Sequence, residues 1–234
     1  MTKIVIPIDS STIAFENVIG FSLIQRVLDN LPSGEIIFVI NPEDASLISD
    51  SPPDTFTIAT STSSRLATVV SLEAPTAGPA CMVLEGVNHL PDDISGEDVI
   101  VSTPDQLIEW NPEHFVAYMK RGDADGGIVT YRGYQSKRPF VNVLTDGTVA
   151  ETSESSPIGH DNACGVYYFA NPLILENAIL QMIAKEKQTS GKFCLAPVFN
   201  EMIIDGMKIL NYPVPKMHDN LDEIRHVYRE KGIF

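Results

Sequence analysis

The chain has 234 residues, of which 44% are hydrophobic and 20% charged, a balance typical of a globular protein rather than a disordered or membrane-spanning one. No apolar run reaches the length that a bilayer requires. The net charge of −15 lies mostly in residues 1–119, which hold 17 acidic residues against 3 basic ones. This imbalance excludes nucleic acids and anionic membranes as partners.

The apolar run that begins at Lys3 has no secretory hydrophobic segment before it, so we expect a cytoplasmic protein. The three cysteines, Cys81, Cys164 and Cys194, are widely spaced and have apolar neighbours. We therefore expect reduced thiols in the core rather than disulfides or metal ligands.

The first half of the chain (residues 1–125) alternates buried-strand patterns with helical ones. Strand, helix and strand at this spacing predict βαβ units and a parallel sheet with right-handed crossovers. Asn111 followed by Pro112 is a favoured helix start. Strands are expected over residues 3–8, 35–40, 55–59 and 66–72 and from Val99, and helices over 17–31, 81–90 and 111–121, with a short one from Asn41–Pro42.

The second half (residues 126–234) has shorter strands joined by turns, of which Asp146-Gly147 is a good hairpin signal. Together the halves predict a single α/β domain over residues 1–234, with a mixed, mostly parallel sheet flanked by helices. Strands are expected over residues 128–131, 140–144, 148–150, 163–169 and 208–214, and helices over 173–187, 195–205 and 221–231.

The run Val99–Trp110 places a carboxylate, Asp105, just after a β-branched strand. Side chains past the carboxyl end of a central strand face the ligand crevice of an α/β sheet, so Asp105 could hold a metal–phosphate ligand. Asp also favours turns, so the residue could instead only cap the following turn. The pair of acids at Asp123 and Asp125 follows a helix end and is interpreted as structural.

In order and spacing, the motifs resemble the sugar-nucleotide nucleotidyltransferases, which join a nucleoside triphosphate to a sugar phosphate, and within them the branch found in surface-polysaccharide loci. The likeness covers roughly residues 66–231. It implies the Rossmann-like nucleotide-diphospho-sugar transferase fold, with a nucleotide-binding half (1–125) and a sugar-binding half (126–234). The motifs that carry it are Thr76–Leu84, Ser102–Gln106 with Trp110, Cys164–Phe169 and Lys192–Asn200.

The resemblance implies that Asp105 is the catalytic, metal-binding aspartate, with Asp219 as a second ligand of Mg²⁺. Gly78 matches the glycine that lets backbone approach the nucleobase, with Thr76 and Ser102 on the same nucleotide side. Gly165 would leave room for a hexose. Glu154 would accept hydrogen bonds from sugar hydroxyls. Each also has a plain structural interpretation: Gly78 as a helix start, Gly165 at a strand crossing and Glu154 as a solvated loop acid.

The expected triphosphate-binding loop departs from the family pattern. Family members have glycines, an arginine and a lysine there, whose N–H groups and cations cradle the phosphates. Here the segment runs through Ile8, Asp9, Ser10 and Ser11 to Asn17 and contains neither glycine nor base. Placing a triphosphate within about 6 Å of its carboxylates costs on the order of several kcal/mol unless metals intervene.

The one concentrated basic patch contains Arg132, Lys137 and Arg138, followed by Phe140. By the resemblance this region flanks the sugar-phosphate pocket, where three cations could hold a phosphate. The alternative is an exposed hairpin tip.

The sequence therefore predicts Mg²⁺-dependent transfer of a nucleotidyl group from a nucleoside triphosphate to a sugar phosphate. Catalysis would rest on positioning and charge neutralisation. Two alternatives stay open: a non-catalytic module or partner subunit that binds nucleotide-sugars or sugar phosphates, and a metal-dependent glycosyltransferase. The oligomeric state is open as well, a homo-oligomer included.

Overall fold

The computed structural model describes residues 1–8, 17–18, 21–42, 55–60, 63–91, 96–133 and 137–230. The strands are β1 (Lys3–Ile8), β2 (Asn17–Val18), β3 (Phe21–Ser22), β4 (Glu35–Ile40), β5 (Thr55–Ala59), β6 (Ser64–Ser71), β7 (Val99–Ser102), β8 (Leu107–Ile108), β9 (Gly126–Arg132), β10 (Phe140–Val143), β11 (Val149–Ser153), β12 (Asp161–Phe169), β13 (Ile209–Val214) and β14 (Met217–His218). The helices are α1 (Leu23–Asp29), α2 (Pro79–Asn88), α3 (Pro112–Arg121), α4 (Pro172–Ala184), α5 (Val198–Ile204) and α6 (Leu221–Glu230).

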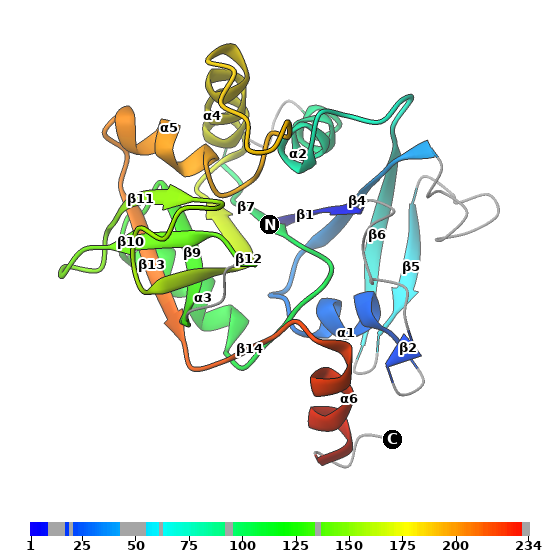
Figure 1. The fold of residues 1–234 in the computed structure, drawn as a ribbon. Coiled ribbons are helices and arrows are strands. Elements are labelled where there is room, and N and C mark those ends of the chain that lie inside the picture. Colours follow the sequence, from blue (N-terminus) through cyan, green and yellow to red (C-terminus); the bar gives the residue numbers. More distant parts are fainter. Residues whose placement is uncertain are drawn as a thin grey trace.

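Within the described residues, ten strands form one sheet that contains strands of both halves (Figure 1). In the first half, β1 pairs in parallel with β4 and β7, and β4 pairs in parallel with β6. The predicted parallel arrangement is therefore confirmed for these four strands, whereas β5 pairs antiparallel with β6. In the second half, β12 is antiparallel to β7, β9 and β10, whereas β13 runs parallel to β9. The sheet is mixed, as expected.

Helices cover both faces of the sheet (Figure 1). The strands contribute side chains to a hydrophobic core on each face. Alternate residues of β1 show how: Ile4 and Ile6 pack in the core with α1, α3 and α6, while Val5 packs in the core with α2, α4 and α5. This alternation follows from the two-residue period of a strand. Among the residues described, every helix is too short or too polar to cross a bilayer.

The predicted helix over residues 17–31 is wrong in its first part. The structure instead pairs β2 with β3 in a short hairpin, and α1 begins only at Leu23. The boundary is fixed at Ser22, whose extended backbone donates its N–H to Gln25 Oε1 at 2.8 Å, one half of a capping box. Apolar spacing alone did not reveal that break.

Other local predictions agree with the structure. Asn111 accepts a backbone N–H at the start of α3, as predicted, and Asn171 does the same at the start of α4. Gly147 has a φ of +84° in the hairpin between β10 and β11. The helix expected from residue 195 starts later, at Val198, after Pro197 in the N-cap position. The short helix predicted from Asn41–Pro42 lies, after Pro42, outside the described residues.

Candidate functional site

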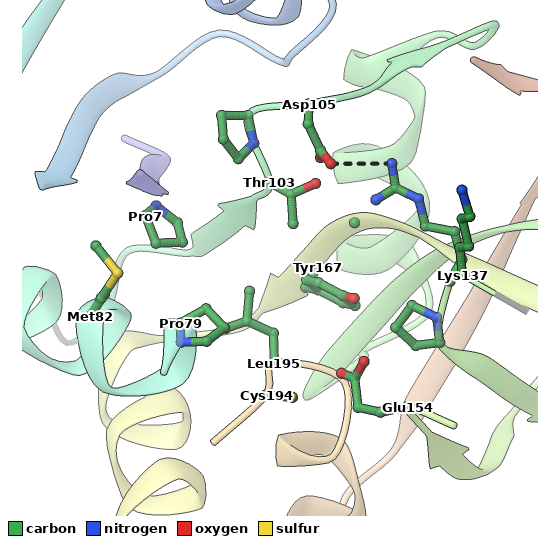
Figure 2. A pocket seen from close by; sticks show the side chains of 14 residues that line it. Pro7, Pro79, Met82, Thr103, Asp105, Lys137, Glu154, Tyr167, Cys194 and Leu195 are labelled. Carbon is green, nitrogen blue, oxygen red and sulfur yellow. Dashed lines mark hydrogen bonds and ion pairs between the residues drawn. The ribbon is translucent and has the colours of Figure 1, made fainter. Parts of the chain in front are cut away.

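A pocket of about 260 Å³ lies at the carboxyl ends of β1 and β7, where the first half meets the second (Figure 2). Ligands of α/β sheets commonly bind at this edge. Among the described residues, its charged side chains are two acids and two bases, so the pocket combines acceptors with cations. The lining residues are Pro7, Pro79, Met82, Thr103, Pro104, Asp105, Lys137, Arg138, Pro139, Glu154, Gly165, Tyr167, Cys194 and Leu195.

Asp105 reaches the pocket because β7 ends in a turn held by hydrogen bonds. The Ser102 hydroxyl donates to the Thr103 carbonyl at 3.0 Å and accepts from the Gln106 amide at 3.2 Å. The Thr103 N–H donates to the Gly165 carbonyl of β12 at 2.8 Å. The Asp105 side chain is 35% exposed, and its Oδ1 is buried without a hydrogen-bond partner among the described residues. That oxygen is an acceptor with an unused lone pair at the site.

A small two-stranded sheet brings Asp219 close to Asp105. Strand β8, just after Asp105, pairs antiparallel with β14, just before Asp219. Next to this pairing, the Glu109 N–H donates to the Lys216 carbonyl at 3.0 Å. The two acids are far apart in sequence but are brought to one place by these short strands.

Arg138 lies between the two acids. Its Nη2 contacts Asp105 Oδ2 at 3.4 Å, and its Nε contacts Asp219 Oδ2 at 3.3 Å. The Arg138 side chain is only 12% exposed. Burial works against the charge of this group, but Asp105 and Asp219 outweigh it and raise the pKa of the guanidinium. The guanidinium of Arg138 therefore keeps its positive charge between the two acids.

Mg²⁺, the metal that the resemblance implies for Asp105 and Asp219, does not fit this arrangement. Carboxylate oxygens are suitable ligands for Mg²⁺, but here both side chains are paired with a guanidinium. In the described part of the chain, no three His, Cys, Asp or Glu side chains gather into a group that could hold a metal. The magnesium site at these two residues stays a prediction from the resemblance, which this arrangement does not support.

Glu154 supplies the second acid of the pocket, on the segment that follows β11. Burial raises the pKa of its carboxyl, while a backbone hydrogen bond with Ala196 opposes the rise. In the view of Figure 2, the Tyr167 ring lies between Asp105 and Glu154. Seen in this view (Figure 2), the Glu154 carboxyl and the ion pair of Asp105 lie on opposite sides of the Tyr167 ring.

The glycines Gly165 and Gly78 both have backbone conformations that favour glycine. Gly165 has a φ of +84°, and a Cβ there would lie 2.3 Å from Thr103 Oγ1. Gly78 has a φ of +134°, and its Cβ would lie 2.7 Å from the Phe193 carbonyl oxygen. Gly165 lines the pocket, whereas Gly78 contributes through its neighbour Pro79.

Several residues predicted for the site do not line this pocket. Ser102 and Ile8 are fully buried, Phe140 is in the core, and Arg132 is exposed at the end of β9. The Thr76 hydroxyl donates to the Gly78 carbonyl at 3.1 Å, which fixes the turn before α2. Asp9, Ser10 and Ser11 lie outside the described residues.

The sequence did not single out several side chains that form the walls. Thr103 and Tyr167 lie inside the quoted motifs, next to predicted residues. Cys194 was expected in the core, but it is partly exposed at the pocket, and burial with a nearby Glu154 raises its pKa to about 11. All three cysteines are free, as predicted, but only Cys164 is fully buried.

Neither a protein-family model nor a curated protein sequence matches this chain. Solved structures do match. A nucleoside-diphosphate-sugar pyrophosphorylase from Vibrio cholerae is 18% identical with a TM-score of 0.71, over 98% of this chain and 100% of that one. A UDP-glucose pyrophosphorylase complexed with UDP-glucose is 14% identical with a TM-score of 0.72, over 99% of each chain.

A CMP:2-keto-3-deoxy-manno-octonic acid synthetase complexed with CTP is 13% identical with a TM-score of 0.66, over 98% of this chain and 99% of that one. Identities this low establish the fold rather than the reaction. The matches extend over nearly the whole chain, both halves included. The chain therefore has the nucleotide-diphospho-sugar transferase fold, which it shares with sugar-nucleotide nucleotidyltransferases.

Proposed function

We propose that this chain is a nucleotidyltransferase-like protein that binds a phosphorylated sugar in the pocket between its halves. The observation that carries the proposal is one pocket that contains two cations, Lys137 and Arg138, together with a half-buried carboxylate, Glu154. Phosphate oxygens require cationic or N–H donors, and sugar hydroxyls require acceptors. A sugar phosphate presents both groups.

The size of the pocket favours a compact ligand. Its volume of about 260 Å³ lies just below the roughly 300–1,000 Å³ typical of small-molecule sites. A hexose phosphate suits such a space better than a complete nucleotide-sugar. Gly165, which has no side chain, and the Tyr167 ring would bound the sugar, with its phosphate at Lys137 and Arg138.

The reaction that we propose is nucleotidyl transfer: an oxygen of the sugar phosphate attacks the α-phosphorus of a nucleoside triphosphate, and pyrophosphate leaves. CTP and UDP-glucose are the ligands of two solved structures that share this fold, which supports the same ligand class here. The protein's residues would contribute by holding the two reactants in line. Synthesis of a nucleotide-sugar for surface polysaccharide is the role that we propose for it.

A second candidate is a non-catalytic module that binds sugar phosphates or nucleotide-sugars. The distribution of charge favours it: both cations of the pocket come from the second half, and among the described residues of the first half only Asp105 adds a charged group. Residues 1–119 hold 17 acids against 3 bases. A triphosphate, with about four negative charges, would meet repulsion on that side.

Calorimetric titration and a pyrophosphate-release assay separate these candidates. We expect a panel of sugar 1-phosphates to contain a ligand, and Lys137→Gln to weaken its binding about tenfold. Arg121→Gln, which removes the same charge from an exposed position on α3, is the control. Pyrophosphate release with a nucleoside triphosphate supports the enzyme, whereas binding without release supports the module. If no sugar phosphate or nucleotide-sugar binds, the proposal is wrong; nucleoside diphosphate released from a nucleotide-sugar would instead indicate a glycosyltransferase.

A further inference from the structure

Two carboxylates from distant parts of the chain share one arginine. Asp105 follows β7 and Asp219 follows β14, and Arg138 contacts both, at 3.4 and 3.3 Å. We infer that Arg138 takes the position that a divalent cation would occupy between these acids, so that the pocket binds its anionic ligand without a bound metal. The ligand part of this inference rests on the proposed function, whereas the cation part does not.

The charges support a permanent counter-ion. A guanidinium stays protonated in proteins, and Arg138 is largely buried against both acids. A divalent ion that entered between the acids would stand directly beside this positive charge. Arg138 would therefore have to leave before a metal could bind.

The backbone also holds Arg138 in place. Its carbonyl accepts a hydrogen bond from the Asn162 amide of β12 at 3.3 Å, and the next residue, Pro139, precedes β10 of the same sheet. The pairing of β8 with β14 fixes the acids on the other side. The side chain is thus fixed between two parts of the fold.

The guanidinium keeps donors for a ligand. Of its five N–H groups, one on Nη2 and the one on Nε point to carboxylates, and within the described part of the chain this leaves three for an anion. Arg138 lines the pocket, and the neighbouring Lys137 adds a second cation. One residue can therefore cross-link the acids and also bind phosphate.

Titration of the whole protein with Mn²⁺ alone, followed by the electron paramagnetic resonance signal of the free ion, tests the cation part. We expect no stoichiometric Mn²⁺ binding by the wild type up to about 1 mM. Arg138→Met should create a site at least about tenfold tighter, since the two acids lose their cation. Adding Asp105→Asn to that variant should abolish the site. Arg121→Met, with the same change of charge on exposed α3, should bind no Mn²⁺.

The inference is overturned if the wild type binds one Mn²⁺ and Asp105→Asn abolishes that binding. It is also overturned if Arg138→Met, still folded by circular dichroism, gains no Mn²⁺. Should Arg138→Met not fold, Arg138→Lys keeps a cation and should resemble the wild type, and the wild-type titration still decides.

Calorimetry with glucose 1-phosphate as the probe tests the ligand part, with and without EDTA. Equal affinity in both conditions supports metal-free binding, and a loss of at least tenfold in EDTA contradicts it. If glucose 1-phosphate binds in neither condition, the proposed sugar-phosphate function is weakened while the Mn²⁺ result stands by itself. Failure of the proposed sugar-phosphate function and failure of the cation inference therefore give different results.

Discussion

Replacing Gly165 with alanine should destabilise the protein for two separable reasons. The first is the backbone: at a φ of +84°, an L-residue costs about 1–2 kcal/mol. The second is contact: the new Cβ would lie 2.3 Å from Thr103 Oγ1, and overpacking of this kind costs about 1–3 kcal/mol. We expect Gly165→Ala to lower the free energy of unfolding by roughly 2–5 kcal/mol in urea denaturation.

Gly147 provides a matched control, because it has the same φ of +84° but nothing within 4 Å of its Cβ position. Gly147→Ala should therefore cost only the backbone part, about 1–2 kcal/mol. The difference between the two variants measures the contact with Thr103 by itself. Since Thr103 also lines the pocket, any shift of this residue should weaken ligand binding only in Gly165→Ala.

A double-mutant cycle completes the test. Thr103 Oγ1 is buried without a hydrogen-bond partner among the described residues, so Thr103→Ala alone should cost little. Combined with Gly165→Ala it removes the 2.3 Å contact and should recover most of the contact cost. If Gly165→Ala costs no more than Gly147→Ala, or the coupling energy stays under about 0.5 kcal/mol, the packing argument is refuted.

Three further predictions concern charge, capping and the pocket. Lys185 and Lys187 outweigh burial and lower the pKa of Glu201, so Glu201→Gln should cost about 1.5–3 kcal/mol at neutral pH. That difference should disappear in urea titrations as the pH falls through the lowered pKa, because the depressed carboxyl stabilises the fold only while ionised. Asn111→Ala removes the cap of α3 and should lower the thermal midpoint, at a cost of about 1 kcal/mol. Glu154→Gln should weaken sugar-phosphate binding about tenfold in calorimetry, with an unchanged thermal midpoint.

Local patterns predicted much of the fold because the forces behind them are local. The β-branched apolar runs of β1, β4 and β7 are typical of buried strands, and Asn111 determines the start of α3 through its own side chain. The hairpin of β2 and β3 was missed because residues 17–31 keep a helical spacing of apolar residues. The signal that could have revealed it is the capping pair of Ser22 and Gln25.

Some members of the candidate site were predicted from the sequence, but their arrangement was not. Asp105, Asp219 and Arg138 were all singled out, yet the pattern assigned the two acids to a metal and the arginine to a phosphate. Their ion pairs join residues 33 and 81 positions apart in the chain. Such contacts depend on the pairing of β8 with β14, two-residue strands that have no pattern of their own.

Strand β12 changes partners along one of its sides close to Gly165. Its beginning pairs with β10 at Asn162, and its end pairs with β7 from Val166 onward, while β9 follows the other side. The boundary between the two halves is thus crossed by a continuous backbone ladder and not by a hinge. The halves cannot swing apart unless those hydrogen bonds break, so a ligand must enter through the mouth of the pocket while the two halves stay joined.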